Sequence, residues 1–141
     1  MPRVAILLAL IVAIAFIART RRSPNANIIA AVKGGIGSLE GDRQVLAQMR
    51  KAGADLSKAT EVNFYLYFKA RPAADSAAAH AGAGPLVATV ERGVDATSWL
   101  CLVSGSMVPD EAAIHSNVVR LLALAKQYGG DYDGWEAAIT K

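Results

Sequence analysis

Two acidic residues near the C-terminus have the spacing of a D-x-D cation-binding pair. Asp131 and Asp133 lie in the stretch QYGGDYDGWEAAI, which runs from Gln127 to Ile139. Carboxylate oxygens bind hard cations such as Ca²⁺, but an EF-hand loop needs further oxygen ligands and a glutamate at its twelfth position. The sequence supplies neither. We therefore expect no bound metal ion and no cofactor here.

The residues that most often carry catalysis do not form a recognisable set. Cys101 is the single cysteine and lies in the apolar run WLCLV, where a free cysteine usually behaves as a small buried hydrophobe. We expect a solvated or helix-capping position for His80 and a surface position for His115. Ser104-Gly-Ser106 differs from the G-x-S-x-G turn of hydrolases. The sequence therefore favours a protein that is not an enzyme.

Two tyrosines are candidates for binding nucleic acid. The segment 61–68 alternates strictly and predicts a strand with one buried face, which leaves Tyr65 and Tyr67 on the other face beside Asn63. RNA-recognition domains stack bases on aromatic side chains of such a face. Tyrosine is also common on half-exposed strands, and the domain lacks a basic surplus. RNA binding through Tyr65 and Tyr67 is therefore the less favoured hypothesis.

The positive charge of the chain is concentrated at its N-terminus. The formal net charge is +3 and the sequence pI is about 9.2. From Ser23 onward, 11 Lys/Arg stand against 12 Asp/Glu, and the excess comes from Arg3, Arg19, Arg21 and Arg22. The basic pI is thus a property of residues 1–22 and does not indicate nucleic-acid binding.

An apolar run of 15 residues without a charge, 4–18, predicts a membrane segment. As a helix it would span roughly 22 Å, which is short of the ~30 Å hydrocarbon core. Arg3 and Arg19 would extend it by reaching the headgroups. A cleaved signal peptide is the alternative, because the length suits its apolar region and Ala13-Ile14-Ala15 has the small-x-small form.

The arginines after this run favour the anchor over the signal peptide. Positive charge is preferentially retained on the cytoplasmic side of a membrane, and Arg19, Arg21 and Arg22 follow the run whereas Arg3 alone precedes it. We therefore predict that residues 1–22 are a single-pass anchor in a bacterial inner membrane, with the C-terminal domain in the cytoplasm.

The rest of the chain reads as a linker, 23–41, and one domain, 42–141. Asp42 is predicted to cap a helix that ends before Gly53. Periodicity then predicts strands over 61–68, 85–91, 98–107 and 132–139 and helices over 72–81 and 109–128. The order β-α-β-β-α-β after an N-terminal helix predicts an α+β, ferredoxin-like sandwich with two helices on one face of a four-stranded sheet.

The C-terminal part of the chain resembles one known family. The stretch VVRLLALAKQYGGDYDGW, residues 118–135, is similar to the last helix and closing strand of the ribonuclease E inhibitor B family, the regulators of ribonuclease E activity B. Members of that family run a helix of the form LxxLAxxF/Y into an acidic-Tyr-Asp-Gly-Trp segment. The matching residues are Leu121, Leu122, Leu124, Ala125, Tyr128, Asp131, Tyr132, Asp133, Gly134 and Trp135.

The resemblance extends over about residues 42–139 and implies a ferredoxin-like domain that regulates RNA turnover by binding ribonuclease E. It makes Asp131, Tyr132, Asp133 and Trp135 candidate partner-binding residues, with closure of the sheet and filling of the core as their structural alternative. Members of the family are strongly acidic, whereas this domain is near neutral. A non-enzymatic regulatory domain tethered to the membrane is the first hypothesis. An RNA-binding module and an accessory subunit of a membrane complex are the alternatives.

Overall fold

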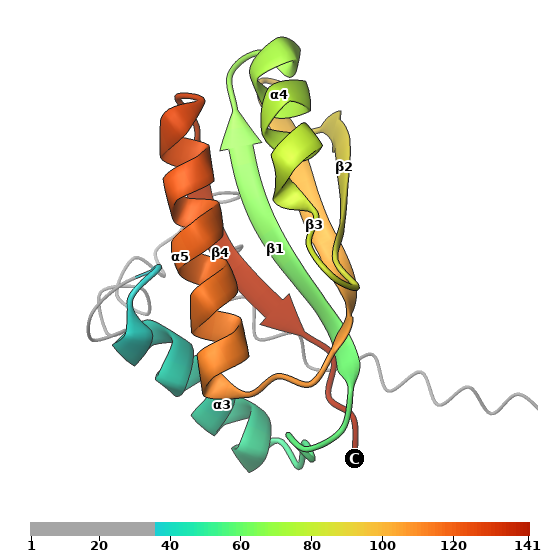
Figure 1. Cartoon of the computed structure of the whole chain (residues 1–141). Helices are drawn as coiled ribbons and strands as arrows, with labels where there is room; N and C mark the ends of the chain where they lie inside the picture. Colours follow the sequence, from blue (N-terminus) through green and yellow to red (C-terminus); the bar gives the residue numbers. More distant parts are fainter. Residues whose placement is uncertain (1–35) are drawn as a thin grey trace, which may run out of the picture.

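The computed structural model describes residues 36–141, which fold into an α+β domain of three helices and a four-stranded antiparallel sheet (Figure 1). The strand order in the sheet is β2-β3-β1-β4. The predicted α+β class and the β-α-β-β-α-β order after a first helix are confirmed. The elements are α3 (Leu39–Lys51), β1 (Thr60–Phe68), α4 (Arg71–Ala81), β2 (Val87–Arg92), β3 (Trp99–Met107), α5 (Glu111–Gln127) and β4 (Asp131–Ala137).

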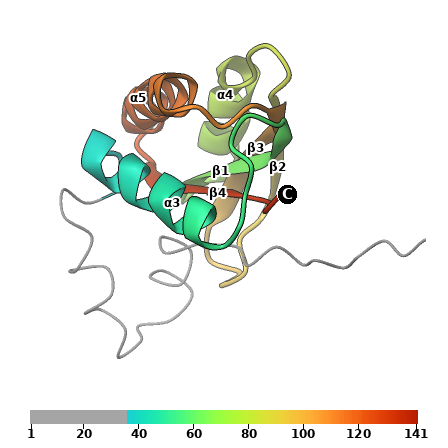
Figure 2. The ribbon, with the colours of Figure 1, turned by 90° about the horizontal axis from the view of Figure 1, so that it is seen from below.

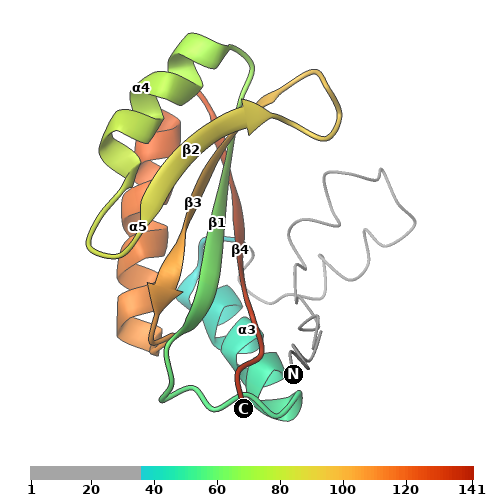
Figure 3. The same cartoon turned by 90° about the vertical axis from the view of Figure 1, so that its right-hand side faces the viewer.

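The helices and the sheet form two layers. Helices α4 and α5 cover one face of the sheet, and α3 packs against α5 along the β4 edge (Figure 2). The central strand β1 directs Val62, Phe64, Leu66 and Phe68 toward the helices, and each is at most 2% exposed. Side chains on a strand alternate between faces, so Asn63, Tyr65 and Tyr67 lie on the opposite face. Within residues 36–141 no helix covers that face, which we call the open face (Figure 3).

A β-bulge in the last strand decides where its side chains point. Tyr65 pairs with Gly134 and Leu66 with Tyr132, so Asp133 is the extra residue. Gly134 has φ +106, which favours glycine. Tyr132 and Trp135, although three residues apart, therefore both lie on the helix-covered face. The Asp133-Gly134 pair thus forms a bulge inside the strand.

The first helix begins earlier than predicted. Helix α3 starts at Leu39 because Ser38 is its N-cap, with Oγ accepting a hydrogen bond from the amide of Gly41 at 2.9 Å. The predicted cap, Asp42, lies inside the first turn and is 3% exposed. Its side chain is therefore free of the capping role and binds other elements. The predicted end is confirmed, since Gly53 follows the C-cap with φ +93.

The predicted membrane segment, residues 4–18, and the arginines around it lie outside the described residues. Among residues 36–141, no helix combines the length and the apolar character that crossing a bilayer requires. The anchor and its orientation therefore stay predictions.

Candidate functional site

Trp135 fixes the last strand to the first helix. Its ring is 5% exposed and lies against Phe64, with ring centroids 6.5 Å apart. Its Nε1 donates a hydrogen bond to Oδ1 of Asp42 at 3.0 Å. A buried indole N–H needs such an acceptor. Trp135 thus both fills the core and holds α3 against the sheet.

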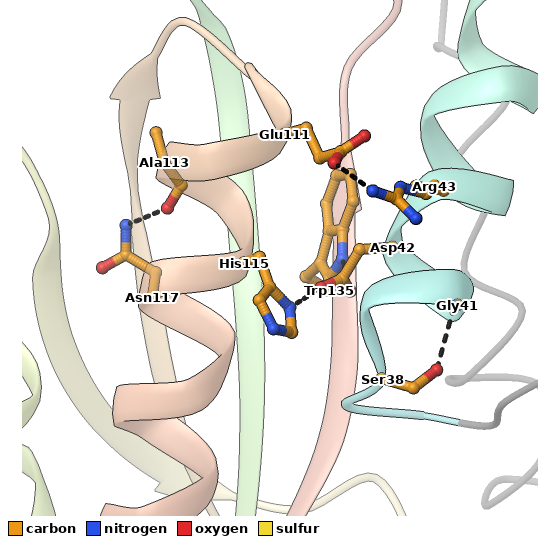
Figure 4. A network of polar contacts seen from close by, with 9 residues as sticks. All are labelled: Ser38, Gly41, Asp42, Arg43, Glu111, Ala113, His115, Asn117 and Trp135. Carbon is orange, nitrogen blue, oxygen red and sulfur yellow. Dashed lines mark hydrogen bonds and ion pairs between the residues drawn. The ribbon is translucent and has the colours of Figure 1, made fainter.

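The second carboxylate oxygen of Asp42 binds the longest helix. Oδ2 lies 2.7 Å from Nδ1 of His115 on α5 (Figure 4). His115, predicted at the surface, is half-buried: its side chain is 28% exposed and contacts Asp42 of α3. Asp42 therefore joins α3, α5 and β4 through two hydrogen bonds. Buried carboxylates are stable only when they are paired in this way.

An exposed ion pair lies next to this buried pair. Arg43 Nη2 and Glu111 Oε1 are 2.9 Å apart, with side chains 52% and 46% exposed. This hydrogen bond holds the pKa of Glu111 below its usual value. Exposed pairs of this kind contribute little to stability, so we attribute the docking of α3 mainly to Asp42 and to the apolar contacts of Leu46 and Met49.

An aspartate bound to a histidine is also found in hydrolase triads, where it orients the imidazole for proton transfer. Here both oxygens of Asp42 are committed to residues that hold elements together. Cys101 lies in β3, and burial raises the pKa of its thiol to about 11. It is therefore protonated at neutral pH, in agreement with the small buried hydrophobe that the sequence predicts. The arrangement supports a structural role for Asp42 and His115.

Tyr132 fills the space between β4, α5 and the start of α3. A Cβ on Gly37 would lie 4.0 Å from its ring. Its hydroxyl is buried and has no hydrogen-bond partner in the structure of residues 36–141. Burial, and then the nearby charges of Asp42 and Asp133, raise the pKa of the phenol well above its usual value. This side chain therefore packs against the core.

A prediction on pH follows from the raised pKa of Tyr132. In the unfolded chain the phenol ionises near its ordinary pKa of about 10, whereas in the folded domain it stays neutral. Its contribution to stability is complete below that pH and is lost as pH rises above it, by up to about 1.4 kcal/mol per pH unit. Urea unfolding from pH 8 to 11 should show a smaller loss for Tyr132→Phe than for the wild type. If the stability of both proteins falls equally with pH, the phenol of Tyr132 does not have a raised pKa in the folded domain.

The two aspartates of the D-x-D stretch have different surroundings. Asp131 is exposed at the start of β4, whereas Asp133 sits at the bulge and is 9% exposed. Within residues 36–141 no three His, Cys, Asp or Glu side chains form a group that could hold a metal ion. Of the four candidate partner-binding residues, only Asp131 presents an exposed side chain.

The open face carries the tyrosines that the sequence analysis singled out. Tyr65 donates its hydroxyl hydrogen to Oε1 of Glu136, which also accepts from Asn63 Nδ2 at 3.3 Å. Burial, and then this hydrogen bond, raise the pKa of Tyr65 above its usual range. Tyr67, although on the predicted face, is 5% exposed. The two rings are therefore part of a packed surface and do not form a free stacking platform.

The open face is also acidic. The strand pairings place four carboxylates on it, and none of its strand residues is Lys or Arg. Arg92 is the one basic residue in the four strands, and it lies on the other face, 4.9 Å from the ring of Trp99. Carboxylates repel phosphates, so the face is unfavourable for RNA. The four acids are Glu61, Glu91, Asp131 and Glu136.

Comparison of the sequence with known protein families identifies the family of this chain. Residues 39–137 match the family described as "Regulator of ribonuclease activity B" (RraB). The chain belongs to this family. No curated protein sequence gives a significant match. The residues that match the RraB family begin at the first residue of α3 and end at the last residue of β4. Helix α3 and its anchor Asp42 are therefore part of the RraB domain.

Sequence reasoning identified the RraB resemblance from the YDGW stretch but missed the contact that holds it. Asp42 and Trp135 are 93 residues apart, and Asp42 and His115 are 73 apart. Neither pair has a local pattern that could have revealed it. The available signal was the Ser38 cap: once it is recognised, Asp42 falls inside a helix and needs a partner of its own.

Proposed function

We propose that this RraB-family chain is a ferredoxin-like, non-enzymatic regulator that acts by binding ribonuclease E. The observation that carries the proposal is the family match, which spans all seven elements of the described domain. The sequence contains no recognisable set of catalytic residues, which agrees with a regulator that is not an enzyme. Regulation by such a domain then depends on a surface that the ribonuclease recognises.

We assign the partner-binding role to the open face. Residues 36–141 contain 10 Lys/Arg and 12 Asp/Glu, so the overall charge of the domain favours neither sign. The open face concentrates four of these acids with no base among its strand residues. Complementary charge steers association and fixes partner orientation. A basic segment of the ribonuclease is therefore the partner chemistry that this face fits, with Asp131 at its rim.

We further propose that residues 4–18 tether the domain to the inner membrane, with the domain in the cytoplasm. Support comes from the uncharged apolar run and from the three arginines after it, since positive charge is preferentially retained on the cytoplasmic side. A protease added to intact spheroplasts should leave the domain undigested, whereas digestion would contradict the cytoplasmic orientation.

The binding proposal is tested with the purified full chain in mild detergent. We expect it to bind ribonuclease E with an affinity that falls with added salt, and to slow cleavage of an RNA substrate. Glu61→Gln/Asp131→Asn should weaken binding about five- to tenfold, the loss expected for two exposed charges. Asp75→Asn/Glu111→Gln removes the same charge from the helix side and should leave binding unchanged.

Other outcomes point to the alternatives. No binding to ribonuclease E would contradict the proposal. Equal losses for both double variants would show that the open face is not the contact. Retention of single-stranded RNA that is lost in Tyr65→Ala would favour the RNA-binding module. Repeated recovery of unrelated membrane subunits with the chain would favour an accessory subunit.

A further inference from the structure

The open face has an apolar centre and an acidic rim. Four side chains occupy the centre, and strand pairing places them side by side: Tyr65, Tyr67, Leu100 and Leu102. Glu61 and Glu136 lie at one end of the face, because Glu136 pairs with Asn63 and Ala138, two residues further on, donates its amide hydrogen to the carbonyl of Glu61. Glu91 and Asp131 lie at the other end, since both belong to the row that contains Tyr67 and Leu100.

One segment of this same chain has the reverse pattern. Residues 19–33 read RTRRSPNANIIAAVK, in which three arginines and Lys33 enclose the apolar residues 28–32. Residues 1–35 contain five Lys/Arg and no acid, whereas all twelve Asp/Glu of the chain lie after them. Cations at both ends of an apolar stretch match a face with acids at both ends of an apolar centre.

The chain enters the described domain beside the β4 edge of the sheet, on the side of the helices. A Cβ at Gly37 would lie 2.5 Å from Leu122 of α5 and 4.0 Å from the ring of Tyr132, and β4 is an edge strand next to β1. Gly37 has φ +88, a conformation that permits a sharp change of direction. The 13 residues between Arg22 and Ile36 can extend about 45 Å, whereas four strands span about 15 Å. Reach therefore does not limit contact between residues 19–33 and the open face.

From charge, apolar pattern and reach, we propose that residues 19–33 dock on the open face of their own domain. Arg21 and Arg22 lie against the acidic rim, and the apolar residues 28–32 lie over Tyr65 and Leu102, the two partly exposed side chains of the centre. The docked segment occupies the surface assigned above to the ribonuclease. It therefore inhibits binding in cis, a consequence that rests on the proposed function.

Docking is measured without any ribonuclease. A nitroxide spin label is attached to Thr20→Cys in the full chain, in mild detergent, and the amide signals of the domain are followed by NMR. Cys101 stays unlabelled at neutral pH, because it is buried and the pKa of its thiol is about 11. We expect the label to broaden the amide signals of Tyr65, Leu102 and Gly134 and to leave α4 sharp. Broadening confined to α4 and α5, or none in residues 36–141, would overturn the proposal.

Matched variants identify the contacts. Replacing Arg19, Arg21 and Arg22 together by glutamine should abolish the broadening, and Glu61→Gln/Asp131→Asn should reduce it severalfold. The helix-side variant Asp75→Asn/Glu111→Gln should preserve it. Broadening that survives the arginine replacement, or that anionic lipid alone restores, would contradict recognition of these arginines by the domain.

Competition is tested separately. If both ligands use one face, the arginine-to-glutamine variant should bind ribonuclease E severalfold more tightly than the wild type, and added ribonuclease should sharpen the broadened signals. If the variant binds ribonuclease E with the affinity of the wild type, and added ribonuclease leaves the signals broadened, the two ligands do not compete for one face. If the ribonuclease fails to bind any form while the broadening is present, the proposed function fails and the docking stands.

Discussion

Asp42→Ala should lower the free energy of unfolding by about 3 kcal/mol, the cost of breaking a buried, charge-assisted pair. Asp42 is 3% exposed and binds both Trp135 and His115. Its removal leaves the indole N–H buried without an acceptor and separates the imidazole from its carboxylate. Urea unfolding followed by the fluorescence of the two tryptophans, Trp99 and Trp135, measures the loss.

The replacement Asp42→Asn separates charge from hydrogen bonding. The amide oxygen can still accept from Trp135 Nε1, so this variant should lose less than Asp42→Ala. Arg43→Ala is the control on the same helix turn, because it breaks only the exposed pair with Glu111. Its effect should be small against that of Asp42→Ala. Similar losses for Arg43→Ala and Asp42→Ala would contradict the role given to Asp42.

The site of the damage is also predictable. Since Asp42 connects α3 to the rest of the domain, Asp42→Ala should increase hydrogen exchange first in Leu39–Lys51. Amides in the central strand β1 should remain protected until global unfolding. Uniform loss of protection across the domain would show that α3 is not a separable unit.

The strands were predictable because their patterns are strong. The alternation in β1 separates a face of buried apolar residues from a face with tyrosines, and the structure reproduces that separation. The apolar stripe and terminal glycines of α5 likewise predict its course and its end. Local patterns thus determine which segments are strands and helices and which face of each is buried.

The α3–α5–β4 contact was not predictable for a physical reason. The Ser38 cap follows a glycine-rich run without a periodic signal, so the local pattern places the helix start at Asp42. That pattern gives the carboxylate of Asp42 a capping role, whereas in the structure it binds residues far away in sequence. The bulge at Asp133 also has no signature, because a single extra residue becomes visible only against the register of β1.

These contacts explain why YDGW identifies the RraB family without marking a partner site by itself. Gly134 needs φ +106 at the bulge, Trp135 needs the acceptor on α3, and Tyr132 fills the space beneath Gly37. The motif is therefore specific because the geometry of the closing strand is demanding. Recognition of a partner is better sought at exposed acids of the open face, Glu61, Glu91 and Asp131.

The adjacent glycines before this motif should differ sharply when substituted. Gly130→Ala should destabilise the domain by about 2 to 3 kcal/mol, the upper range for overpacking. A Cβ at Gly130 would lie 2.5 Å from ring atoms of Phe68 and 2.6 Å from the carbonyl oxygen of Tyr67. Phe68 is 2% exposed, so its ring has little room to move. The Tyr67 carbonyl belongs to the central strand, which cannot shift without disturbing its pairings.

Gly129 is restricted by its backbone conformation and not by close packing, so it provides the matched control. It follows the C-cap of α5 with φ +71, and a Cβ there would meet no atom within 4 Å. Gly129→Asn should therefore cost well under about 1 kcal/mol, since asparagine tolerates the left-handed region. Thermal unfolding of the two variants compares the cost of close packing at Gly130 with the cost of the left-handed backbone conformation at Gly129. A larger loss for Gly129→Asn than for Gly130→Ala would show that the turn after α5 is limited by backbone conformation and not by close packing against β1.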